Sequence, residues 1–150
     1  MNFPYSSIIS TSADGGDFLL FRRPEIPVTI IGAAGRATFI GLVDTGSDNT
    51  IFPKSVADNL GIPLQVTNDP DASVFGGNHV RLLSGEAILQ LESEGERVSW
   101  SAPISFFESS RTEEIVILGH SGFLDYFTAT FDGALGMLTL VANDLLPRSQ

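Results

Sequence analysis

The stretch Phe39-Ile40-Gly41-Leu42-Val43-Asp44-Thr45-Gly46-Ser47 decides the fold of this chain. Residues 39–43 are apolar on both faces of an extended segment, which predicts a strand covered on both sides. The strand delivers the Asp44 carboxylate into a turn, where Gly46 lets the backbone bend sharply. A carboxylate held rigidly at the end of a buried strand can be placed beside a water molecule, so Asp44 is the main functional candidate.

Two segments together resemble a known family. Residues Asp44-Thr45-Gly46-Ser47-Asp48-Asn49-Thr50 resemble the active-site turn of the retropepsin-like aspartic proteases, usually Asp-Thr-Gly-Ala/Ser followed by an acidic residue. Residues Ile115-Val116-Ile117-Leu118-Gly119 look like the family's apolar-apolar-Gly motif, which packs beside the catalytic turn and opens a short helix. The motifs occur in the family's order, and the resemblance covers roughly Ile26 to Val141.

The resemblance implies an all-β fold, a closed acid-protease β-barrel with one or two short helices, active as a two-fold homodimer. It implies catalytic roles for Asp44, Thr45 and Gly46, with Thr45 bracing its counterpart across the dimer and Gly46 offering a carbonyl to substrate. Ser47 would hydrogen-bond the carboxylate. The residues that it implies for substrate binding are Ser47, Asp48, Val74, Phe75, Gly76, Gly77, Asn78, Ile117 and Gly119.

One departure from the family concerns the residue after the second glycine. Retroviral members usually have Arg there, whereas this chain has His120. The partner of Asp48 is therefore open among a protonated His120, Arg22 and Arg23.

The length predicts one domain, because 150 residues with 43% hydrophobic composition can form a single sizeable core. We expect an N-terminal arm over 1–25, the protease domain over 26–142, and a loose tail over 143–150. The resemblance implies that the arm crosses to the partner subunit. A two-lobed aspartic protease brings two Asp-Thr-Gly turns in a much longer chain. Only one is present here, so if catalysis needs two carboxylates, the other must come from a second copy.

Periodicity and turn residues predict the remaining elements. We expect a strand around 18–21 within an otherwise loop-like arm, a hairpin over 28–43, a helix over 53–61, strands over 85–92 and 98–106, and a final hairpin over 127–141 that closes the sheet or joins the dimer interface. Trp100 is expected in the core. Pro103 suggests a strand edge or a bulge.

Residues 64–83 predict a further hairpin, because short apolar segments flank Gly76-Gly77-Asn78. The resemblance implies that this hairpin is the flap that closes over substrate and excludes water. An ordinary surface hairpin is the alternative.

Charge and composition exclude several functions. The formal charge of −10 and the absence of a basic patch argue against nucleic-acid binding. Without cysteine there are no disulfides or thiolate metal sites, and no apolar run approaches a membrane span. The N-terminus lacks the features of a signal peptide, so a cytoplasmic location is the default expectation. We expect the partners to be a second copy and a peptide or protein substrate, with no cofactor and no metal.

Two alternatives to an aspartic endopeptidase remain. The first is a retropepsin-like dimerisation or peptide-binding module without turnover, which peptide binding without product would reveal. The second is a metal-dependent hydrolase using Asp44, Asp48, His79 and His120. Two isolated histidines without ligand spacing make that second alternative poor.

Overall fold

The computed structural model describes residues 1–74, 78–108 and 115–147, and the side chains of residues 1–67, 81–108 and 115–147. The elements are β1 (Asn2–Pro4), β2 (Ser6–Thr11), β3 (Phe18–Arg23), β4 (Glu25–Gly32), β5 (Gly35–Val43), β6 (Ile51–Pro53), α1 (Lys54–Leu60), β7 (Gln65–Val74), β8 (Asn78–Ser93), β9 (Glu96–Phe107), β10 (Val116–Leu118), the single 3-10 turn η1 (Leu124–Tyr126), β11 (Phe127–Asp132) and β12 (Met137–Ala142).

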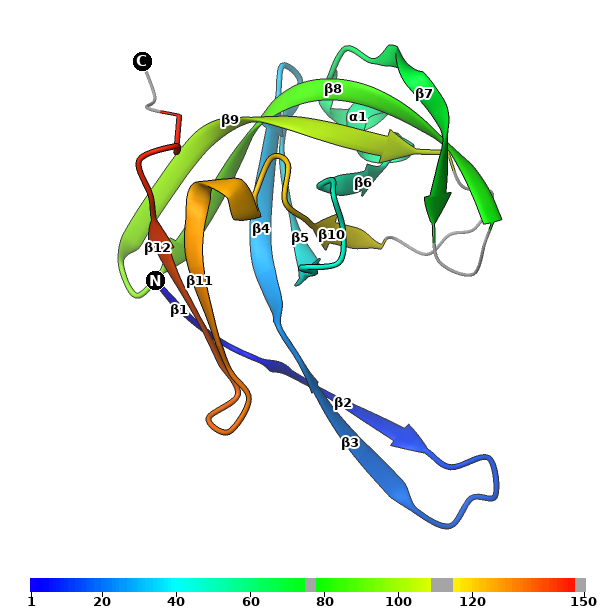
Figure 1. The fold of residues 1–150 in the computed structure, drawn as a ribbon, viewed down its shortest axis with the longest axis vertical. Coiled ribbons are helices and arrows are strands. Elements are labelled where there is room, and N and C mark those ends of the chain that lie inside the picture. The colour runs from blue at the N-terminus through cyan, green and yellow to red at the C-terminus, as the bar shows by residue number, and fades with distance from the viewer. Residues whose placement is uncertain (75–77, 109–114, 148–150) are drawn as a thin grey trace.

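Six strands form a closed barrel (Figure 1). Their order is β4-β5-β10-β6-β9-β8, and the pairing of β4 with β8 closes the ring, while β7 extends the sheet from β8. The pairs β5–β10 and β6–β9 are parallel, and the other neighbours in the ring are antiparallel. The predicted all-β closed barrel with one short α-helix is confirmed.

Strict alternation in β8 and β9 builds the core. Their inward residues are buried, and Trp100 is 1% exposed with its indole N–H donating to Gly122 O at 2.9 Å. Trp100 is therefore a core residue, as predicted. Pro103 lies in a part of β9 that pairs with β8 and not with β6, so its missing N–H removes no hydrogen bond to β6.

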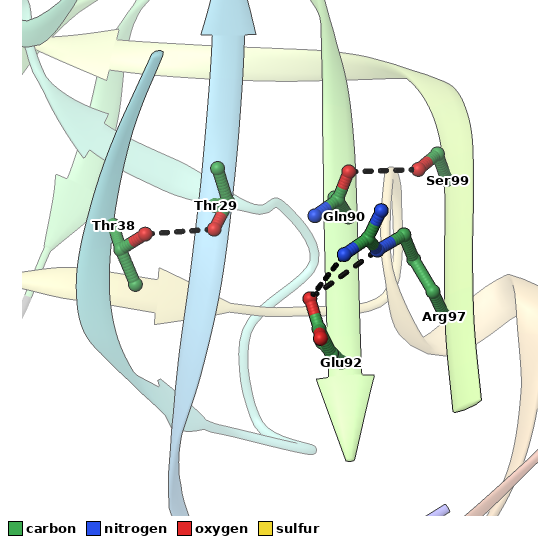
Figure 2. A network of polar contacts seen from close by, with 6 residues as sticks. All are labelled: Thr29, Thr38, Gln90, Glu92, Arg97 and Ser99. Atoms are coloured by element: carbon green, nitrogen blue, oxygen red, sulfur yellow. Dashed lines mark hydrogen bonds and ion pairs between the residues drawn. The ribbon is translucent and has the colours of Figure 1, made fainter. Parts of the chain in front are cut away.

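Polar side chains pair across β5, β4, β8 and β9 on the outer face of the barrel (Figure 2). The hydroxyls of Thr29 and Thr38 lie 2.8 Å apart, and Arg97 Nη2 donates to Glu92 Oε2 at 3.0 Å. Such cross-strand pairs stabilise the register while leaving this face compatible with water.

The helix prediction is also confirmed. Pro53 precedes α1, and Gly61 ends it in the left-handed conformation (φ 65°) with its N–H bonded to Ala57 O. Val56 and Leu60 are buried one turn apart and fasten the helix to the barrel.

The N-terminal arm contains more strand than predicted. Besides β3, the stretch that was expected to be loop forms β1, which pairs with β12, and the Ser- and Thr-containing β2, which pairs with β3. The two errors have different causes: the partner of β1 is distant in the sequence, whereas the hydroxyl residues of β2 resemble loop composition although its partner β3 follows closely.

The final hairpin, β11–β12, forms a separate three-stranded sheet with β1 and does not enter the barrel. The start of the tail is held by packing: Asn143 Nδ2 donates to Asp125 O at 3.0 Å, and Leu146 packs against the core. In the described part of the chain, no helix has the length and apolar character needed to cross a membrane.

Candidate active site

Asp44 follows the last residue of β5, at the lower end of the barrel strand. Its N–H donates to Leu118 O at 3.0 Å, and the N–H of the preceding Val43 donates to Pro24 O at 2.9 Å. Val43 is 4% exposed, whereas Asp44 is half-buried. The buried strand therefore fixes the backbone while the carboxyl group reaches the surface.

The turn orients its own carboxylate. Asp44 Oδ1 accepts the Gly46 N–H at 2.8 Å, and Asp44 O accepts the Ser47 N–H at 3.2 Å. Within the described residues, Oδ2 has no hydrogen-bond partner. One oxygen is thus held by the backbone, and the other is available to a water molecule or a second carboxyl group.

The segment around Gly119 holds the Asp44 turn in place through backbone hydrogen bonds. His120 N–H donates to Ser47 O and Ser121 N–H donates to Asp48 O, both at 2.9 Å. A Cβ on Gly119 would lie 2.6 Å from Ser47 O and closer still to Asn49 O, so only glycine fits. The apolar-Gly motif packs beside the Asp44 turn, as the resemblance implied.

His120 contacts the Asp44 turn directly but does not pair with Asp48. Its Nε2 lies 3.0 Å from Thr45 O, and because a carbonyl oxygen only accepts, this bond needs the proton on Nε2. Its Nδ1 lies 3.8 Å from Asp125 Oδ1.

The three candidate partners of Asp48 all make other contacts. Arg22 contacts Gly133 O, and Arg23 lies 3.9 Å from Glu25. The Asp48 carboxylate has no ion pair among the described residues.

Some of the predicted site residues are exposed at the turn, and others hold the turn in place. Thr45, Gly46 and Asp48 are exposed at the turn. The prediction for Ser47 was wrong in its partner, because its hydroxyl donates to Asn49 O at 2.8 Å and not to the Asp44 carboxylate. A hydroxyl has one proton to donate, and here the Asn49 carbonyl accepts it.

Two residues predicted to bind substrate lie beneath the surface. Ile117 is 7% exposed and pairs with both Leu42 and Ile51, and Gly119 is buried. In a single chain they therefore support the turn. For the predicted flap, the structure shows β7 and β8 paired up to Val74 and Asn78, whereas residues 75–77 lie outside the described residues.

An open hollow of about 350 Å³ lies beside the carboxylate. It is lined by Pro24, Leu42, Val43, Asp44, Thr45 and Phe131. Sequence reasoning missed Pro24 and Phe131, which come from the base of the arm and from β11. No feature of the sequence around Pro24 pointed to the site, and no local pattern links Phe131 to a turn 87 positions away. Across the described residues, no group of three or more metal-ligating side chains occurs.

No protein-family model matches this chain, and no curated protein matches it. Among solved structures, the EIAV protease complexed with the inhibitor HBY-793 is similar at 16% identity and a TM-score of 0.41, over 63% of this chain and 81% of that chain. A retropepsin-like aspartic protease from Rickettsia conorii is similar at 19% identity and a TM-score of 0.44, over 92% of this chain and 95% of that chain. Similarity at this level says nothing of the chemistry. The chain's own closed barrel, with the Gly119 segment packed against the Asp44 turn, is the retropepsin-like architecture that the two motifs predicted.

Proposed function

We propose that this chain is an aspartic endopeptidase that acts as a homodimer, with Asp44 of each subunit meeting at the two-fold axis. The observation that supports it best is the geometry of the turn: a half-buried carboxylate at a strand end, with Oδ1 held by the Gly46 N–H at 2.8 Å. This arrangement holds one oxygen still and presents the other to a reactant.

The need for a second copy follows from the chemistry. One carboxylate can activate water, but peptide hydrolysis also needs an acid at the carbonyl oxygen and at the leaving amine. The sequence has a single Asp-Thr-Gly turn, and Thr45 and Gly46 beside it are exposed. A two-fold dimer supplies the second carboxylate from an identical surface.

Two carboxyl groups a few ångströms apart share one proton, because both cannot ionise easily. The ionised Asp44 removes a proton from water, whose oxygen attacks the peptide carbonyl carbon. The protonated Asp44 of the other subunit hydrogen-bonds the carbonyl oxygen. A proton then passes to the amine as the carbon–nitrogen bond breaks.

The surroundings of Asp44 suit a peptide with apolar side chains. The hollow beside the carboxylate includes Leu42, Pro24 and a Phe131 that is 38% exposed. We propose that the β7–β8 hairpin closes over the substrate and excludes water, with residues 74–78 as its tip.

The test is cleavage of a diverse peptide mixture from acidic to neutral pH by the wild type and by Asp44→Asn. Asparagine keeps an oxygen for the Gly46 N–H, so the turn persists while the general base is lost. Asp58→Asn, which alters an exposed carboxylate on α1, is the matched control.

Products from the wild type and from Asp58→Asn, but not from Asp44→Asn, are the expected result. If none of the three proteins cleaves any peptide at a concentration where the dimer is shown to form, the proposal is wrong. The binding-module alternative would then be examined by peptide capture.

A further inference from the structure

The β2–β3 hairpin projects from the barrel as an isolated arm (Figure 1). It pairs with no other strand in the described structure. Every residue of β3 is exposed, although its first four are Phe18-Leu19-Leu20-Phe21. The exposed fractions of these four side chains are 79%, 50%, 64% and 47%, and that of Ile9 on β2 is 69%.

Both faces of the arm are apolar. Ile9 lies opposite Leu20, with Phe18 on the same face, and Ile8 lies opposite Phe21, with Leu19 on that second face. A hairpin with one solvated face would alternate between apolar and polar residues. This arm is therefore built to be covered on both sides.

The exposed apolar area is large for such a small element. A whole aromatic side chain has a surface of about 150–250 Å², and an aliphatic one somewhat less. Multiplied by their exposed fractions, the five most exposed side chains of the arm together present roughly 500 Å² of apolar surface. This area is divided between the two faces of the hairpin, and a lone two-stranded hairpin is marginally stable in water, so a partner surface that covers both faces would stabilise it. On the barrel strands in Figure 2, the exposed apolar residues Ile40 and Ile88 are single ones among hydroxyls and an ion pair.

The base of the arm is anchored beside the proposed active site. Val43 N–H donates to Pro24 O, Tyr5 N–H donates to Gly136 O at 2.8 Å, and Arg22 Nη2 donates to Gly133 O at 3.5 Å. Pro24, at the root of β3, lines the same hollow as Asp44. The direction of the arm is therefore set relative to the catalytic turn, and a protein surface that approaches Asp44 meets the arm.

We propose that this hairpin is an arm that packs against a second copy of the chain and holds the two Asp44 turns together. The inference rests on the proposed homodimer. A two-fold dimer contains two arms, which together contribute roughly 1,000 Å² of apolar surface. The surface that each arm covers on the other subunit adds to this area. A standard interface buries about 1,200–2,000 Å² in total, so the arms supply a large share of it.

The test is sedimentation of the full chain over a range of concentrations. Leu20→Glu alters one face of the arm and Phe21→Glu alters the other. Ile88→Glu is the matched control, because Ile88 is a 45% exposed apolar residue on β8, lining a separate surface hollow. Each arm substitution should raise the dimer dissociation constant at least about 100-fold, because the change occurs twice per dimer. Ile88→Glu should leave it within about threefold.

The outcomes separate the arm from the catalytic proposal. Circular dichroism should show a folded barrel in all variants, since the altered side chains lie outside the core. If both arm variants dimerise like the wild type, the arm proposal is wrong and the catalytic proposal stands on the Asp44→Asn assay. If the wild type is monomeric at every concentration, the arm and the homodimer are both overturned.

Discussion

Replacing Gly119 with alanine should destabilise the chain and disable the catalytic turn together. The new Cβ would lie 2.6 Å from Ser47 O, well inside contact distance, and the obstacle is backbone. The Asp44 turn must therefore move by roughly 0.5–1 Å away from the Gly119 segment. That movement weakens the backbone bonds His120 N–Ser47 O, Ser121 N–Asp48 O and Asp44 N–Leu118 O.

The magnitude follows from these contacts. Overpacking costs about 1–3 kcal/mol, and one or two weakened backbone bonds add about 0.5–1.5 kcal/mol each, which together suggest about 3 kcal/mol. Urea unfolding at one fixed protein concentration measures this loss, and the midpoint should fall by about 1–2 M. Peptide cleavage should fall at least about tenfold under conditions where the variant remains folded, because the displaced carbonyls belong to the catalytic turn.

Gly133→Ala is the matched control, because a Cβ there meets nothing within 4 Å. Its unfolding midpoint should equal that of the wild type. If Gly119→Ala lay within about 0.5 kcal/mol of this control, the structural role assigned to the Gly119 segment would be refuted.

Two further predictions concern the same site. His120→Ala removes the bond to Thr45 O and should lower kcat about three- to tenfold with little change in KM. The loss in free energy of unfolding should stay at about 1 kcal/mol, because the side chain is 49% exposed. An unchanged kcat in steady-state assays would contradict this role. The proposed homodimer should weaken as pH rises, because two Asp44 carboxyl groups that meet at its axis would bind a shared proton that separated subunits release. The dissociation constant should rise by up to about tenfold per pH unit where the dimer alone holds that proton. Sedimentation across pH measures this dependence, and Asp44→Asn should abolish it. A wild-type dissociation constant that is independent of pH, or that falls as pH rises, would show that the dimer holds no shared proton.

Local pattern was sufficient where neighbours in the sequence are also neighbours in space. The alternation of residues 87–91 and 98–106 predicts which faces are buried, because side chains along a strand point alternately to opposite sides. The helix at α1 was readable from Pro53 and Gly61, whose backbone preferences define its ends. The turn at Asp44 was readable from its glycine for the same reason.

Pairing between distant segments was not readable in this way. The composition of residues 1–25 concealed β1, whose partner β12 lies near the other end of the chain. It also concealed β2, although its partner β3 is close in sequence, because the Ser and Thr of β2 resemble a loop. Ser47 was assigned to the carboxylate, but the loop's own Asn49 carbonyl takes its hydroxyl. His120 was a candidate partner for Asp48, but the geometry of the Gly119 segment directs its ring to Thr45 O.

The sequence by itself determined the barrel strands other than β6, the helix and the position of the Asp44 turn, because these depend on residue preferences and periodicity within short windows. Only the tertiary structure decided that Pro24 and Phe131 line a hollow at Asp44, that Ile117 and Gly119 lie beneath the turn, and that an apolar hairpin projects beside it. Those facts depend on which distant strands pair and on which side chains remain exposed when the barrel has closed. Neither the pairing nor the exposure can be read from any single stretch of the chain.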